Sequence, residues 1–85
     1  MKDTEYCRKT ADLGRYGRRT LVYSLILNEQ GGFGVSIAIP EFGETETVTD
    51  ITSDKEKMLS LLDVLATNFV TPVSLRDILE DWLGN

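Results

Sequence analysis

The residues best suited to chemistry are few, because the 85-residue chain has no histidine and a single cysteine. Without an imidazole there is no Ser-His or Cys-His nucleophile pair and no nitrogen ligand of the kind that zinc commonly uses. Arg8 and Lys9 follow Cys7, and their charges favour the thiolate, but no histidine can serve as its base. We therefore interpret Cys7 as an incidental thiol and expect a non-enzymatic protein without a cofactor.

Carboxylates gather at two places where oxygen ligands could hold calcium or magnesium. Asp50 and Asp54 flank an expected strand-to-helix turn, and three more lie on an expected helix, namely Asp77, Glu80 and Asp81. Their spacing matches no calcium-binding loop, and acidic residues in a first helical turn stabilise the helix without any metal. We therefore expect no metal site.

The charge is unevenly distributed along the chain. Residues 1–19 carry six basic and three acidic groups, a net +3, and the other 66 residues carry three basic and eleven acidic groups, a net −8, which sum to −5. Tyr16 lies among Arg15, Arg18 and Arg19, a pattern that could contact phosphates and stack on bases. The basic segment could instead fold back on the acidic body or be solvated. We rank nucleic acid below these two readings because the body would repel it.

The acidic body suggests a second hypothesis. Carboxylates on a compact surface could imitate a phosphate backbone and occupy the basic groove of a nucleic-acid enzyme, as phage-type inhibitors do. The residues that would serve this role are Glu44, Glu46, Asp50, Asp77, Glu80 and Asp81. Acidic surfaces also serve solubility alone, so both readings stay open.

Two alternating runs predict a β-hairpin. The odd positions from Leu21 to Leu27 and from Phe33 to Ile39 are all large and apolar. A five-residue loop containing Gly31-Gly32 would pair Leu27 with Phe33, Leu25 with Val35 and Tyr23 with Ile37, and place these side chains on one face. After a turn at Pro40–Gly43, the Thr- and Glu-rich run from Glu44 to Thr49 predicts an edge strand.

Two helices follow. Ser53-Asp54-Lys55-Glu56 has the pattern of a capping box with Ser53 at the N-cap, and the apolar stripe behind it ends near Asn68 or Phe69. Thr71-Pro72 opens the second helix, whose expected inner face consists of Leu75, Ile78, Leu79, Trp82 and Leu83. We interpret Trp82 first as a core residue and second as an interface anchor.

The order of these elements predicts an α+β fold: a three-stranded antiparallel β-meander followed by two α-helices packed on one face. We expect one α+β domain over residues 20–85, preceded by a basic leader over residues 1–19 that is either mobile or an edge segment. The N-terminal residues mix both charge signs and no apolar run is long enough for a membrane span, so we expect a cytoplasmic protein.

The runs 48–56 and 68–83 resemble a family of short, uncharacterised bacterial proteins known only as a domain of unknown function. The resemblance covers residues 20–83. It implies a bacterial or phage-borne protein of the cytoplasm and supplies no catalytic or binding residues.

We expect the protein to act through protein contacts, as an interaction or regulatory module. A sheet covered on one side would leave Val22 and Ile26 exposed, and a second copy of the chain could cover them as a homodimer. Phe42, at a turn, either folds over the core or meets a partner. The carboxylates Glu44, Glu46, Asp77, Glu80 and Asp81 complete the expected contact set, and Arg15, Arg18 and Arg19 are the contacts of the nucleic-acid alternative.

Overall fold

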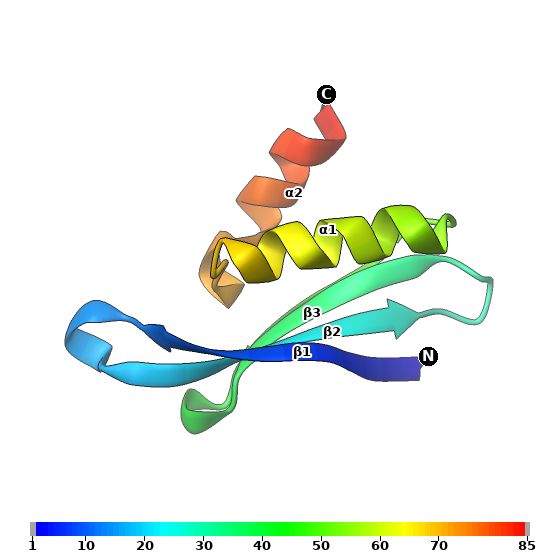
Figure 1. The fold of residues 1–85 in the computed structure, drawn as a ribbon. Coiled ribbons are helices and arrows are strands. Elements are labelled where there is room, and N and C mark those ends of the chain that lie inside the picture. The colour runs from blue at the N-terminus through cyan, green and yellow to red at the C-terminus, as the bar shows by residue number, and fades with distance from the viewer. Residues whose placement is uncertain (1, 85) are drawn as a thin grey trace.

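The computed structural model describes residues 2–84 as a four-stranded antiparallel sheet with two helices (Figure 1). The strands lie in chain order as β1 (Lys2–Asp12), β2 (Arg18–Leu27), β3 (Phe33–Ile39) and β4 (Glu44–Thr52). The helices are α1 (Lys55–Thr67) and α2 (Leu75–Gly84), and short 3-10 turns are η1 (Gly14–Tyr16), η2 (Pro40–Phe42) and η3 (Pro72–Ser74). The predicted α+β class with an antiparallel sheet is confirmed, but the predicted number of three strands is wrong.

The additional strand is β1, which pairs antiparallel with β2 and forms one edge of the sheet. The sequence does not predict this strand, for two reasons. The helix-facing side of β1 buries only Ala11, so the strand carries no run of alternating apolar residues. A bulge between Glu5 and Cys7 also shifts the alternation by one residue, which breaks the period of two from which strands are predicted.

The central hairpin has the predicted register. Leu27 pairs with Phe33, Leu25 with Val35 and Tyr23 with Ile37. The Asn28 side chain organises the loop, since its Oδ1 accepts hydrogen bonds from the backbone N–H groups of residues 30 and 32 at 3.1 and 2.8 Å.

Strand β4 is the opposite edge, as predicted, and it bulges where it passes Gly34. A Cβ at Gly34 would lie 2.7 Å from the Cα of Thr49, so only glycine fits. Within the bulge Asp50 adopts a φ of 57°.

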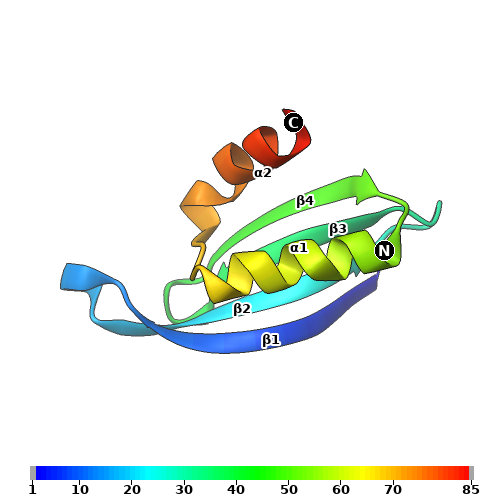
Figure 2. The same ribbon diagram turned by 45° about the horizontal axis from the view of Figure 1, so that its top comes forward.

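Helix α1 lies along one face of the sheet and forms the core with it (Figure 2). Its buried residues are Met58, Leu61, Leu62, Leu65 and Ala66. The N-cap is Asp54, whose Oδ1 accepts hydrogen bonds from the N–H groups of Glu56 and Lys57 at 3.1 and 3.2 Å. The prediction of Ser53 as N-cap is therefore wrong by one residue. A carboxylate at this position also faces the positive end of the helix dipole.

The sheet face away from the helices differs from the expectation. Val22 and Ile26 are buried, although neither belongs to the core beneath α1. Both lie on a central strand, and β1 places Arg8 beside Val22 and Asp3 beside Ile26. Strand β1, which was not predicted, thus covers Val22 and Ile26, and the prediction that these two side chains are exposed is wrong.

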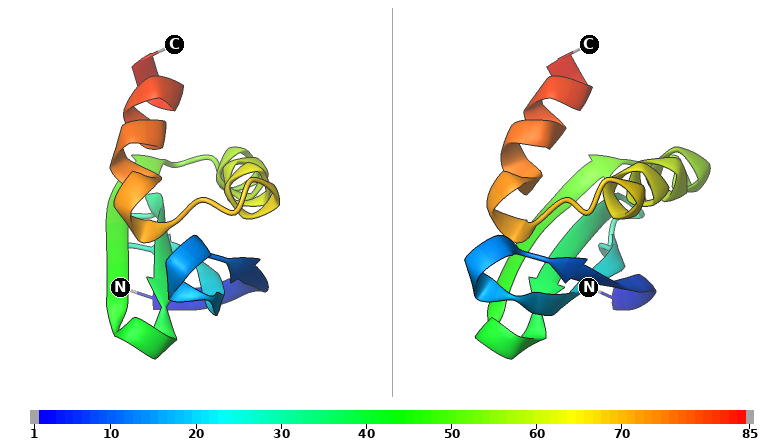
Figure 3. Two further views of the ribbon diagram at one scale, coloured as in Figure 1. Left: turned by 90° about the vertical axis from the view of Figure 1, so that its left-hand side faces the viewer. Right: turned by 60° about the vertical axis from the view of Figure 1, so that its left-hand side comes forward.

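Helix α2 rises away from α1 and the sheet toward the C-terminus (Figures 1 and 3). Its first turns bury Leu75 and Leu79, whereas Trp82 and Leu83 are exposed. The prediction that the whole stripe faces the core is therefore wrong, because the helix extends beyond the body that could cover it. Among residues 2–84 no helix is long and apolar enough to cross a membrane.

Candidate functional site

A groove of about 730 Å³ opens at one end of the sheet, where three connections meet. The connections are the β1–β2 turn, the β3–β4 turn and the segment between α1 and α2. We call it the aromatic groove; its lining residues are Leu13, Tyr16, Ile39, Phe42, Gly43, Glu44, Thr71 and Val73. Three of its apolar side chains remain accessible, with exposed fractions of 56% for Tyr16, 46% for Phe42 and 78% for Val73.

The β1–β2 turn supplies Leu13 and Tyr16. Its backbone closes on itself, because the Leu13 N–H donates to the Gly17 carbonyl at 2.9 Å and the Gly17 N–H donates to the Gly14 carbonyl at 3.0 Å. Gly14 and Gly17 have φ values of 66° and 76°, which favour glycine. Asp12 accepts a further hydrogen bond from the Gly14 N–H. This self-closed turn holds Tyr16 at the mouth of the groove.

The β3–β4 turn supplies Phe42, whose ring meets that of Tyr16 edge to face at a centroid distance of 5.9 Å. The adjacent Glu41 ties this turn to β2, since its carboxylate accepts hydrogen bonds from the N–H and hydroxyl groups of Thr20. The Glu41 backbone N–H, followed by Thr20 and the charge of Arg19, lowers the pKa of the Glu41 carboxyl below its usual value.

The segment between α1 and α2 supplies Thr71 and Val73. Phe69 follows the C-cap of α1 with a φ of 52°, and the Val70 N–H donates to the Leu65 carbonyl at 3.0 Å. The buried Tyr23 hydroxyl on β2 then donates to the Val70 carbonyl at 2.9 Å. Burial raises the pKa of Tyr23 well above its usual value. A side chain from the middle of the sheet therefore fixes the position of this wall of the groove.

Cationic side chains lie over the exposed rings at this end. The guanidinium of Arg19 is 5.1 Å from the centroid of Phe42, and that of Arg15 is 5.8 Å from the centroid of Tyr16. Lys9 lies 5.8 Å over Phe69, which borders a second hollow of about 300 Å³ that shares Leu13 with the groove. Over the described part of the chain, Arg15, Arg18 and Arg19 form no ion pair.

The structure brings some of the predicted contact residues together. Phe42 and Glu44 line the aromatic groove, and Arg15 and Arg19 flank it, while Arg18 is exposed nearby on β2. Val22 and Ile26 are buried on the far sheet face and take no part in it.

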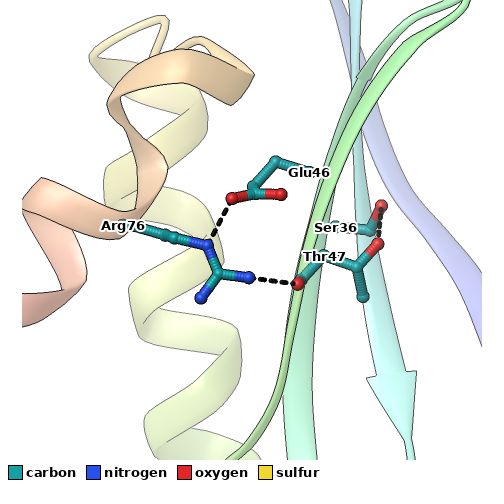
Figure 4. Close-up of polar contacts among 4 residues, drawn as sticks. All are labelled: Ser36, Glu46, Thr47 and Arg76. Carbon is teal, nitrogen blue, oxygen red and sulfur yellow. Dashed lines mark hydrogen bonds and ion pairs between the residues drawn. The ribbon is translucent and has the colours of Figure 1, made fainter.

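The remaining predicted carboxylates lie on β4 and α2. Glu46 forms an ion pair with Arg76, whose guanidinium also donates to the Thr47 carbonyl at 3.4 Å and so joins α2 to β4 (Figure 4). Asp77, Glu80 and Asp81 are exposed on α2, and Asp50 is exposed at the β4 bulge.

Leu13, Thr71 and Val73 were missed by the sequence analysis. The pair Gly14 and Gly17 around Arg15-Tyr16 is the signal that could have revealed a turn there, and with it the position of Leu13. No comparable signal points to Thr71 and Val73, since they join the site only through the path of the chain after α1.

Within residues 2–84, no three His, Cys, Asp or Glu side chains lie close enough together to hold a metal ion. Cys7 is a half-buried free thiol on β1.

Comparison with known families matches residues 2–85 to a family of unknown function (DUF6514). The chain belongs to this family. The resemblance to a domain of unknown function is thereby confirmed, and the match extends to β1 as well. Neither the curated proteins nor the solved structures gave a match to this DUF6514 protein.

Proposed function

We propose that this protein is a non-enzymatic interaction module whose aromatic groove binds an apolar anchor of a partner protein. The observation that carries this proposal is the exposure of Tyr16, Phe42 and Val73 around one hollow, each supplied by a different connection. Such large apolar side chains gathered at one surface are typical of protein contacts. Tyrosine and arginine are also the residue types enriched where binding energy concentrates.

The rigidity of the groove supports the same proposal. The β1–β2 and β3–β4 turns are joined by the Tyr16–Phe42 ring contact and by the two guanidiniums that lie over these rings. The segment between α1 and α2 is joined to the sheet by the Tyr23–Val70 hydrogen bond. A surface that is already ordered before binding loses less conformational entropy when a partner docks. An enclosed ligand pocket would bury its lining, whereas these walls stay open to solvent.

The charges near the groove indicate the chemistry of the partner. Residues 13–19 contain three arginines and no carboxylate. A partner segment with acidic residues beside its apolar anchor would therefore be favoured on the side of the groove formed by the β1–β2 turn. The acidic-mimic alternative has weaker support, because Arg76 pairs with Glu46 and interrupts the acidic surface of β4 and α2.

A peptide selection tests the proposal. A phage library of random peptides is selected on the immobilised full-length protein, and synthetic versions of the recovered peptides are titrated by fluorescence polarisation. We expect peptides with an aromatic or large aliphatic anchor beside acidic residues. Val73→Asp should weaken their binding about tenfold or more, since an exposed apolar side chain of the groove lining is replaced by a charge.

Val64→Asp is the matched control, because Val64 is also an exposed valine, at 53%, but lies on α1 outside the groove. It should bind the peptides as the wild type does. Peptides that bind the Val73→Asp and wild-type proteins equally would contradict the proposal. So would a protein that selects no peptide but retains a labelled single-stranded oligonucleotide through Arg15, Arg18 and Arg19.

A further inference from the structure

Helix α2 carries an apolar stripe that the protomer covers only in part. Leu75 and Leu79 are buried in the core, and Ile78 is half-buried. Trp82 and Leu83 continue the same stripe by one further turn and are exposed, on the part of the helix that projects from the body (Figure 3). We call Trp82 and Leu83 the α2 tip. It presents a tryptophan, the residue type most enriched among interface anchors, with 36% of its surface left uncovered by its own protomer.

The base of the same helix lies at the aromatic groove. Thr71 and Val73 line the groove and immediately precede α2, which begins at Leu75. A helix of ten residues is about 15 Å long. If two α2 helices pack antiparallel about a two-fold axis, the tip of each therefore lies beside the base of the other. In one interface each α2 tip then occupies the groove of the partner, so that both grooves are filled and both tips are covered, as closed two-fold symmetry requires.

The charges of α2 are complementary to those on the β1–β2 side of the groove, while Glu44 lines the groove from β4. The exposed side of α2 presents Asp77 and Glu80. The β1–β2 side of the groove presents Arg15 and Arg18, which form no ion pair within residues 2–84. Opposite charges around an apolar contact favour an arrangement that places each acidic α2 beside the arginines of the partner's groove. The α2 tip thus has the chemistry deduced for the groove's partner, an apolar anchor beside acidic residues.

We infer that the α2 tip of a second copy of this chain occupies the aromatic groove and that the protein forms a two-fold dimer through these reciprocal contacts. This inference rests on the proposed function, since it names an occupant of the same groove. It places the dimer interface at α2 and the groove, and not on the sheet face that contains Val22 and Ile26.

The single tryptophan of the chain makes the test direct. Full-length protein is diluted while Trp82 emission is recorded, and its mass is measured by light scattering over the same concentrations. We expect a dimer mass at high concentration and a red shift of the emission on dilution, as Trp82 leaves the partner's groove. Leu83→Asp and Val73→Asp should each raise the dimer dissociation constant about 30-fold or more, and Val64→Asp should leave it unchanged.

Two results would contradict the dimer. A wild type that stays monomeric with constant Trp82 emission would overturn the inference, as would a dimer that survives both Leu83→Asp and Val73→Asp. Amide NMR spectra of the variants verify that each is folded. Because Leu83 lies outside the groove, the Leu83→Asp protein should still bind the selected peptides. A monomeric wild type that binds these peptides more tightly than the Val73→Asp protein refutes the dimer alone, whereas peptides that bind both proteins equally refute the proposed function.

Discussion

Replacing Tyr23 by phenylalanine removes a single hydroxyl that joins the sheet to the groove. The Tyr23 hydroxyl donates to the Val70 carbonyl at 2.9 Å, and both residues are buried. Phenylalanine keeps the ring and its packing beneath α1, but it leaves the Val70 carbonyl without this donor. The next residue along the chain, Thr71, lines the aromatic groove. The substitution therefore tests stability and groove geometry together.

The expected loss is the cost of leaving a buried carbonyl unpaired. Such a group costs about 1–3 kcal/mol. For a domain of this size each kcal/mol lowers Tm by about 4–8 °C, so a loss of about 2 kcal/mol lowers it by about 8–16 °C. Tyr16→Phe is the control, because Tyr16 is more than half exposed and its ring alone contacts Phe42. It should change Tm little.

The pH dependence provides a second measure of the same group. Because burial raises the Tyr23 pKa in the folded protein, the unfolded chain releases this proton first, near the ordinary tyrosine pKa of 10.0. The stability that Tyr23 contributes is therefore complete below pH 10.0 and is lost as the pH rises toward the higher folded pKa. Urea unfolding at several alkaline pH values should show this loss in the wild type and a smaller loss in Tyr23→Phe. A variant as stable as the wild type with the same alkaline profile would refute the reasoning.

Three further substitutions have defined outcomes. Gly34→Ala forces a Cβ against the backbone of β4 and should cost about 2 kcal/mol or more in urea unfolding, whereas Gly84→Ala, with open space around it, should cost little. Glu41→Gln removes a carboxylate whose folded pKa is lowered; the resulting Tm difference from wild type should be present at neutral pH and vanish as the pH falls well below 4.5, and a difference that persists there would contradict the assignment. Asp54→Ala removes the α1 N-cap and should cost about 1 kcal/mol in thermal unfolding, while an equal loss for Ser53→Ala would show the cap to be misassigned.

The parts of the fold that were predictable are those with a dense apolar period. The β2–β3 register follows from the alternation around Tyr23 and Val35, and α1 follows from its stripe of buried residues. Strand β1 escaped prediction because an edge strand with one solvated face and a bulge needs few apolar residues. Its absence from the prediction also produced the wrong expectation for Ile26, since cover from a neighbouring strand cannot be deduced when that strand is missing.

The candidate site was only partly predictable for a different reason. Phe42 drew attention as an aromatic residue at a turn, and Arg15 and Arg19 as basic residues near tyrosine. Which surfaces they share depends on three connections that meet only in the folded protein. The exposure of Trp82 likewise depends on how far α2 extends beyond the sheet, which helical periodicity does not determine.

The most direct test of the central claim is an amide NMR titration of the full-length protein with a selected peptide. The aromatic groove predicts that shifts concentrate on its three connections, at Leu13, Phe42, Gly43, Thr71 and Val73. Val73→Asp should abolish these shifts at the same peptide concentration, and Val64→Asp should preserve them. Shifts confined to the far sheet face around Ser24 and Ser36, or the same groove shifts in the Val73→Asp protein, would contradict the account.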